Sequence, residues 1–175
     1  MQPSVLCPRA NGLVEVAVLR TMGPPDWHMD IPERSARIRS AITNSGFAIP
    51  TGEITAVLPI DATPASPALD LPLALCVLLS DRANEHLQRD GWIAWGALGL
   101  DGTLGPVDEP IVNDLGPGPY VGRIWEPTDH VPAPHEDAVI SVVAVDNLAQ
   151  AWDIVLGFAR IEEMLVAEGA VANPN

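Results

Sequence analysis

The chain has 175 residues, of which 47% are hydrophobic and 18% charged, which suits one folded domain and excludes a disordered acidic chain. Acidic residues outnumber basic ones by 23 to 9, and the net charge of −14 disfavours binding to the phosphate backbone of DNA or RNA. All nine basic residues are arginine, so mechanisms that depend on a lysine are excluded.

No segment resembles a targeting or membrane sequence. The first residues lack the basic start and apolar core of a signal peptide. The longest apolar run, Leu71 to Leu79, is far shorter than the roughly 20 residues of a membrane helix. The two cysteines form no Cys-x-x-Cys pair, and Cys76 lies in the apolar run, where we expect a buried residue. We therefore expect a cytoplasmic protein that carries no cofactor and does not contact a membrane.

The first third of the chain predicts a strand, an irregular connection and a helix. Residues 1–12 are interpreted as an N-terminal extension, and the β-branched run at 13–20 predicts the first strand. Residues 22–32 contain three prolines and predict an irregular connection, in which Trp27 is expected to cover the core. A helix is predicted from Pro32 to about residue 42, with Gly46 as its left-handed C-cap.

Three arginines lie on this predicted helix, at positions 34, 37 and 39. In so acidic a protein, they are expected to form a solvated face with local ion pairs rather than a basic binding patch.

The segment that follows is the most apolar part of the chain. Residues 53–60 predict a second strand, which leads through a proline-bearing loop at 61–67 into an apolar helix. Asp70 and Pro72 suit the first turn of that helix, which is apolar nearly all round and is therefore expected in the core. Free N–H groups at such a helix start can bind a ligand, although an ordinary core helix begins in the same way.

The second half of the chain predicts short strands, loops and a last helix. Residues 92–100 and 103–107 predict a hairpin, because Asp101-Gly102 between them is a tight-turn signal. The other expected elements are a short helix at 81–90, a loop or a weakened helix at 108–122 and a loop at 128–137. Strands are expected at 123–127 and 138–145, and a helix at 148–168 precedes a frayed tail at 169–175. The order of elements predicts a single α/β (α+β) domain over residues 13–168.

Three sequence blocks together resemble one known family. They are Arg37-Ile38-Arg39-Ser40-Ala41-Ile42-Thr43-Asn44-Ser45-Gly46-Phe47, Asp70-Leu71-Pro72-Leu73-Ala74-Leu75 and Leu100-Asp101-Gly102-Thr103-Leu104-Gly105-Pro106-Val107. Their order and spacing resemble the N-terminal domain of the magnesium-chelatase-like ComM proteins, and Gly23-Pro24-Pro25-Asp26 resembles that family's Gly-Leu-Pro-Asp. The resemblance covers residues 13 to 160. It implies a mixed sheet packed against helices, as in the proteolytic domain of Lon, the C-terminal domain of RadA and the second domain of a small-subunit ribosomal protein.

The resemblance also directs attention to the loop before the apolar helix. Lon-type peptidases carry a serine there and activate it with a lysine, and Ser66 lies close to that place. No lysine is present to form the pair, and the family's lysine-glycine loop pattern is replaced by Pro64-Ala65-Ser66. We retain Asp61, Thr63, Ser66 and Asp70 as a candidate ligand or partner loop. The family normally joins this domain to an ATPase, but a phosphate-binding P-loop also needs a lysine.

A second candidate site is acidic and contains two histidines. Asp129, His130, His135, Glu136 and Asp137 group five potential zinc ligands. The residues between the histidines, Val-Pro-Ala-Pro, are stiff, and no helical His-Glu-x-x-His spacing occurs. A solvated acidic loop is therefore the expected structure, with His130 and His135 as weak metal candidates.

These observations leave three functional hypotheses. The first is a non-catalytic, stand-alone interaction or assembly domain that contacts a protein partner or a second copy, and serves an ATPase or a DNA-processing machine. Its candidate interface anchors are five tryptophans, most of which are expected in the core, at positions 27, 92, 95, 125 and 152. The second is an unusual or degenerate serine hydrolase centred on Ser66. The third is an acidic mimic of nucleic acid, which would occupy the basic channel of a partner.

Overall fold

A computed structural model describes residues 3–9, 12–59, 66–81, 92–109, 122–125 and 142–157. Its helices are α1 (Pro32–Asn44), the short 3-10 helix η1 (Pro67–Leu69) and α2 (Asp70–Ser80), and residues 148–157 are also helical. Its strands are β1 (Ser4–Arg9), β2 (Gly12–Thr21), β3 (Asp26–His28), β4 (Glu53–Val57), β5 (Trp92–Trp95), β6 (Ala97–Leu98), β7 (Leu104–Gly105), β8 (Gly122–Trp125) and β9 (Val142–Ala144).

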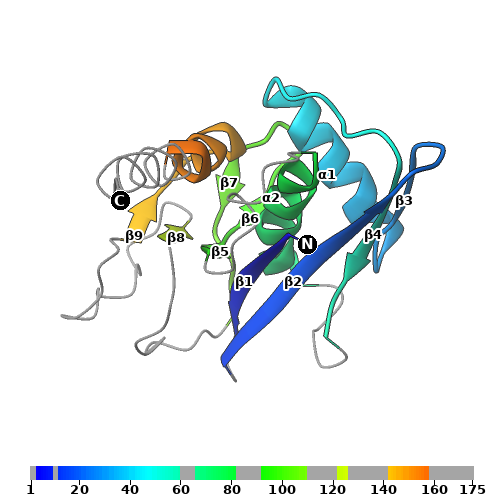
Figure 1. Cartoon of the computed structure of the whole chain (residues 1–175). Coiled ribbons are helices and arrows are strands. Elements are labelled where there is room, and N and C mark those ends of the chain that lie inside the picture. Colours follow the sequence, from blue (N-terminus) through cyan, green and yellow to red (C-terminus); the bar gives the residue numbers. More distant parts are fainter. Residues whose placement is uncertain are drawn as a thin grey trace, which may run out of the picture.

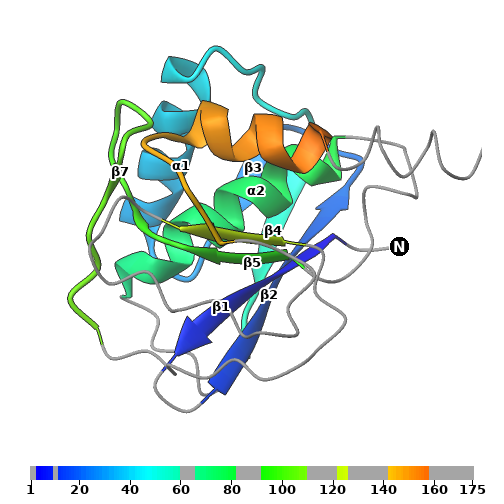
Figure 2. The ribbon, with the colours of Figure 1, turned by 90° about the vertical axis from the view of Figure 1, so that its left-hand side faces the viewer.

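Seven strands form one mixed sheet in the order β3-β4-β2-β1-β5-β8-β9. The β1–β2 and β2–β4 pairs are antiparallel, whereas β1–β5, β3–β4, β5–β8 and β8–β9 are parallel. The helices α1, α2 and 148–157 lie on the same face of the sheet (Figure 1 and Figure 2). The predicted mixed α/β fold is therefore confirmed.

The two helices that carry the family blocks form where local signals predict them. α1 begins with Pro32, and Gly46, with φ of +83°, adopts the left-handed conformation expected just beyond its C-terminus. α2 is buried from Asp70 to Leu79, and a helix that is apolar all round must lie in the core. Trp27 is buried beside these helices, which confirms that it covers the core.

The N-terminal residues were interpreted wrongly as an extension, because β1 lies inside the sheet between β2 and β5. Val5 and Cys7 point into the core and are fully buried. Pro8 obscured this strand in the sequence, since proline cannot donate a hydrogen bond to a sheet. The register pair between β1 and β5 joins Leu6 to Ile93, two residues before Pro8. The proline therefore lies near the strand's end, where the missing N–H is tolerated.

Two smaller differences concern the strands. The segment at 22–32 is not wholly irregular, because residues 26–28 form the edge strand β3 and pair with β4. The predicted strand at 92–100 is divided at Gly96, whose φ is +151°, so that β5 stays in the large sheet. β6 leaves it and forms the predicted hairpin with β7 across the Asp101-Gly102 turn. Within the described ranges, no helix is long and apolar enough to cross a membrane.

Several predictions fall on residues that the structure does not describe. They include the short helix at 82–90, the loops at 110–121 and 128–137, the end of the last helix and the tail. Asp61, Thr63, His130 and His135 also lie outside the described residues.

Candidate functional site

Ser66 begins the helical segment that leads into α2. It is the N-cap of η1, and its Oγ accepts a hydrogen bond from the backbone N–H of Ala68 at 3.3 Å. A serine suits this position because its side chain satisfies an N–H group that has no partner inside the helix. The residue is buried, so its hydroxyl faces other protein groups.

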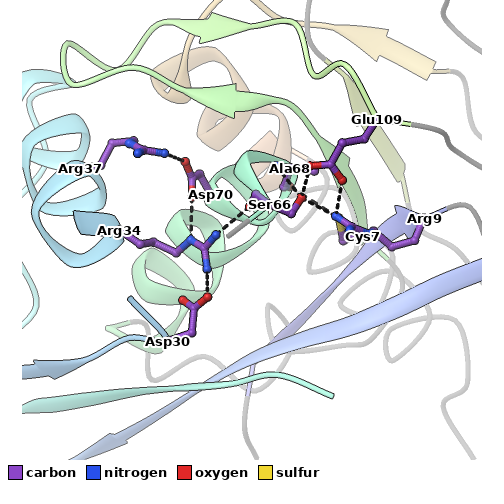
Figure 3. A network of polar contacts seen from close by, with 9 residues as sticks. All are labelled: Cys7, Arg9, Asp30, Arg34, Arg37, Ser66, Ala68, Asp70 and Glu109. Atoms are coloured by element: carbon purple, nitrogen blue, oxygen red, sulfur yellow. Dashed lines mark hydrogen bonds and ion pairs between the residues drawn. The ribbon is translucent and has the colours of Figure 1, made fainter. Parts of the chain in front are cut away.

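Two charged side chains from distant parts of the chain meet the Ser66 hydroxyl (Figure 3). Arg9, at the end of β1, donates a hydrogen bond to Oγ, and Oγ donates to Oε1 of Glu109 at 2.6 Å. Arg9 and Glu109 also pair directly, with Nη1 and Oε2 2.8 Å apart. A hydroxyl offers one donor and two acceptor positions, and all three are occupied at Ser66.

A second part of the same network joins α1 to the first turn of α2. Asp70 accepts from Arg34 Nε at 2.8 Å and from Arg37 Nη1 at 2.5 Å. The side chains of Arg34 and Asp70 are 1% and 0% exposed, so this ion pair is completely buried. Arg34 also pairs with Asp30 and donates to the backbone carbonyl of Ser66 at 2.7 Å. Arg34 therefore connects the two halves of the network (Figure 3).

The prediction of a solvated arginine face on α1 is wrong for Arg34. This residue lies on the same stripe as Ile38 and Ala41, one and two turns later, so it points towards the core. Arg37 is partly exposed and pairs with Asp70, while the guanidinium of Arg39 stacks 4.6 Å from the centre of the Trp27 ring. Of the two carboxylates that pair with Arg34, Asp70 lies on another helix, where sequence spacing does not indicate it.

The thiol of Cys7, next to this network, is buried. Cys7 Sγ donates to the carbonyl of Ala68 at 3.5 Å, and burial raises the pKa of the Cys7 thiol to about 12. A thiol with so high a pKa is protonated at neutral pH and is a poor nucleophile or metal ligand. Within the described residues, no group of three histidine, cysteine or acidic side chains could hold a metal ion.

The network is balanced in charge and completely hydrogen-bonded at the serine. Three arginines, at 9, 34 and 37, face three carboxylates, at 30, 70 and 109. The Oγ lone pairs that would attack a substrate already accept hydrogen bonds from Arg9 and Ala68. This arrangement holds β1, α1, the start of α2 and the segment after β7 together.

Sequence reasoning identified Ser66 and Asp70 but missed their partners. The structure brings the two residues into one network, in which Arg34 bridges them by donating to the Asp70 carboxylate and to the Ser66 carbonyl. Asp30 and Arg34 could have been found as an i, i+4 pair at the start of α1. Arg9 and Glu109 gave no signal, because they lie far apart in the sequence.

Comparison with protein families supports the resemblance found in the sequence. A family model described as subunit ChlI of Mg-chelatase matches residues 14–113, which is more than half of the chain. No curated protein matches the chain. The matched region contains most of β2, all of α1, α2 and the β6–β7 hairpin, and the residues Ser66, Asp70 and Glu109. The chain therefore belongs to the family of subunit ChlI of Mg-chelatase.

Proposed function

We propose that this protein is a non-catalytic interaction domain that binds a protein partner, and that the partner belongs to or serves an ATPase. One observation carries the proposal: the three hydrogen-bonding positions of the Ser66 hydroxyl are all occupied, by Arg9, Glu109 and the N–H of Ala68. A serine held in this way stabilises the fold rather than attacking a substrate.

The arginine pairs support the same proposal. A lysine with a lowered pKa could activate a serine, but the chain contains none. The cations nearest the start of α2 are Arg34 and Arg37, and both are paired with Asp70. Arginine keeps its proton in proteins and cannot act as a general base. Lon-type peptidases, which this chain resembles, carry their catalytic serine in the loop before the apolar helix. In this chain, Ser66 of that loop belongs to an ion-pair network.

The interaction role is tested by isolating the protein from its native host. The chain, carrying a purification tag, is crosslinked in the cells, purified under denaturing conditions and analysed by quantitative mass spectrometry. We expect one protein partner in near-stoichiometric amount. Light scattering of the purified chain at high concentration tests the alternative of self-association. A monomer that captures no protein in stoichiometric amount would contradict the proposed function.

A further inference from the structure

The sheet has a second face, opposite the helices, whose side chains are arranged in rows. Val16, Val18 and Ile54 are fully buried beneath the helices, so their neighbours along β2 and β4 point the other way. Residue pairing across the strands then aligns three rows. The rows are Ser4–Ala17–Val57, Leu19–Thr55–His28 and Thr21–Glu53–Asp26. We call the nine side chains of these rows, together with Glu15 of β2, the open face.

At the centre of the open face, Ser4 and Ala17 are buried, whereas the apolar side chains of Leu19 and Val57 are accessible. Leu19 and Val57 are 46% and 45% exposed, which makes them two of the few large hydrophobic side chains that remain in contact with solvent in the described ranges. An open pocket of about 350 Å³ adjoins Val57, and its lining also includes Ala17, Leu58 and Pro59. Ser4 and Glu15 complete the lining, and a hollow whose walls are mostly apolar can accept one aliphatic or aromatic side chain of a partner.

Carboxylates flank this apolar centre on both sides. Glu15 lines the pocket and is exposed. Asp26 and Glu53 lie in the opposite row, and Nε2 of His28 lies 3.6 Å from Asp26 and 3.3 Å from Glu53. Among the described side chains, no arginine forms an ion pair with any of these three carboxylates. These carboxylates give the two ends of the open face a negative charge, which attracts cations.

We propose that the open face binds a segment of a protein partner in which an apolar side chain is flanked by lysine or arginine. The apolar side chain would enter the pocket beside Val57, and the flanking cations would face Glu15 at one end and Glu53 at the other. This inference rests on the proposed function and names the surface and the partner chemistry for it.

Charge complementarity selects this occupant over a second copy of the chain. Two copies would bring two acidic open faces together while each carries a net charge of −14, and like charges across an interface disfavour association. A basic partner gains from the same field, which also accelerates its association.

The chemistry is tested by selecting phage-displayed random peptides against the folded wild-type chain. We expect the enriched peptides to share an apolar residue flanked by lysine or arginine. A synthetic peptide with the enriched sequence is then titrated by fluorescence anisotropy. Leu19→Arg and Val57→Arg are expected to weaken its binding at least about tenfold, because each places a charge in the contact centre. Leu100→Arg is the matched control, since Leu100 is also exposed but lies in the β6–β7 turn.

A milder variant guards against misfolding of the two arginine variants. Glu15→Gln alters only an exposed side chain, and we expect it to weaken binding and to reduce the salt dependence of the dissociation constant. Acidic or uncharged enriched peptides, no enrichment, or equal binding by all variants would overturn the inference. Dimerisation that Leu19→Arg abolishes would overturn it as well.

The two proposals fail in different ways. If the native partner is still captured by the Leu19→Arg and Val57→Arg variants, the open face is not its binding surface, although the interaction role stands. If the wild type captures no partner at all, the interaction role itself fails.

Discussion

Asp70 shows how a single buried carboxylate fixes the relative position of two helices. It lies in the first turn of α2, where the helix dipole favours a negative charge, and it accepts from Arg34 and Arg37 of α1. Burying charges is costly, so such a pair contributes less to net stability than to specifying which groups must meet. Removing one partner nevertheless leaves a buried charge without compensation, and that cost is large.

The variant Asp70→Asn is therefore expected to lower the free energy of unfolding by about 3–5 kcal/mol, because Arg34 stays buried without its carboxylate. The matched control is Asp81→Asn, at the other end of α2. Asp81 pairs with Arg20 at 2.8 Å but is half exposed, so we expect a loss of at most about 1 kcal/mol. Urea denaturation followed by circular dichroism measures both, and equal losses would refute the structural role of the buried pair.

At the scale of elements, the β6–β7 hairpin holds the end of α1 against the start of the last helix. Asn44 of α1 donates to the carbonyl of Leu100 at 2.8 Å, and the N–H of Leu148 donates to the carbonyl of Gly102 at 2.9 Å. Gly102 has φ of +86° and lies against Ser45, so its conformation and its lack of a side chain are both required.

Replacing Gly102 by alanine is expected to destabilise the protein by about 1–3 kcal/mol, through the left-handed backbone and the overlap of Cβ with the Ser45 hydroxyl. Gly105→Ala in β7 is the control, because its Cβ would meet nothing within 4 Å, and we expect a change within about 0.5 kcal/mol. Thermal unfolding by calorimetry compares the two. A Gly102→Ala protein as stable as Gly105→Ala would contradict the tight hairpin contact.

The elements show where sequence reasoning was sufficient and where it failed. α1, α2 and the hairpin were predictable, because a proline start, a glycine cap, an apolar run and an Asp-Gly turn are local signals. β1 was missed, since Pro8 disguised a strand whose place is set by pairing with distant residues. Most of the described site was missed for the same reason: Ser66 and Asp70 were found, but Arg9, Arg34 and Glu109 are brought to them by the fold.

At the scale of the whole molecule, β1 and α2 are joined through one core. Cys7 of β1 and Cys76 of α2 are both fully buried, and burial raises the pKa of each thiol above its ordinary value of 9.0. Cys76 Sγ also donates to the carbonyl of Val16 in β2, at 3.3 Å. A reagent that needs a thiolate can therefore reach either residue only when the sheet opens.

We accordingly expect neither cysteine to react with a disulfide reagent in the native protein at about pH 8, and both to react together across the urea transition. The variants Cys7→Ala and Cys76→Ala identify which thiol has reacted. Early reaction of Cys7 alone would show that β1 detaches as an independent extension and would contradict its central place in the sheet.

The same pKa shifts predict how stability depends on pH. Unfolded thiols lose their protons near pH 9.0, whereas the folded thiols stay protonated there. The contribution of the two cysteines is therefore fully present below this pH and declines as the pH rises above it. Urea denaturation of the wild type and of the two alanine variants between pH 8 and 10 measures the effect. The wild type is expected to lose more stability over this range than either variant, and parallel curves would contradict the prediction.

The central claim is that Ser66 supports the fold of an interaction domain and is not a nucleophile. The most direct test is intact-mass spectrometry after incubation with a fluorophosphonate, with the Ser66→Ala variant in parallel and an active serine hydrolase in the same tube as a positive control. We predict that the hydrolase is labelled while the wild type and Ser66→Ala both remain unmodified. A stoichiometric adduct on the wild type that is absent from Ser66→Ala would contradict the claim and identify the protein as a serine hydrolase.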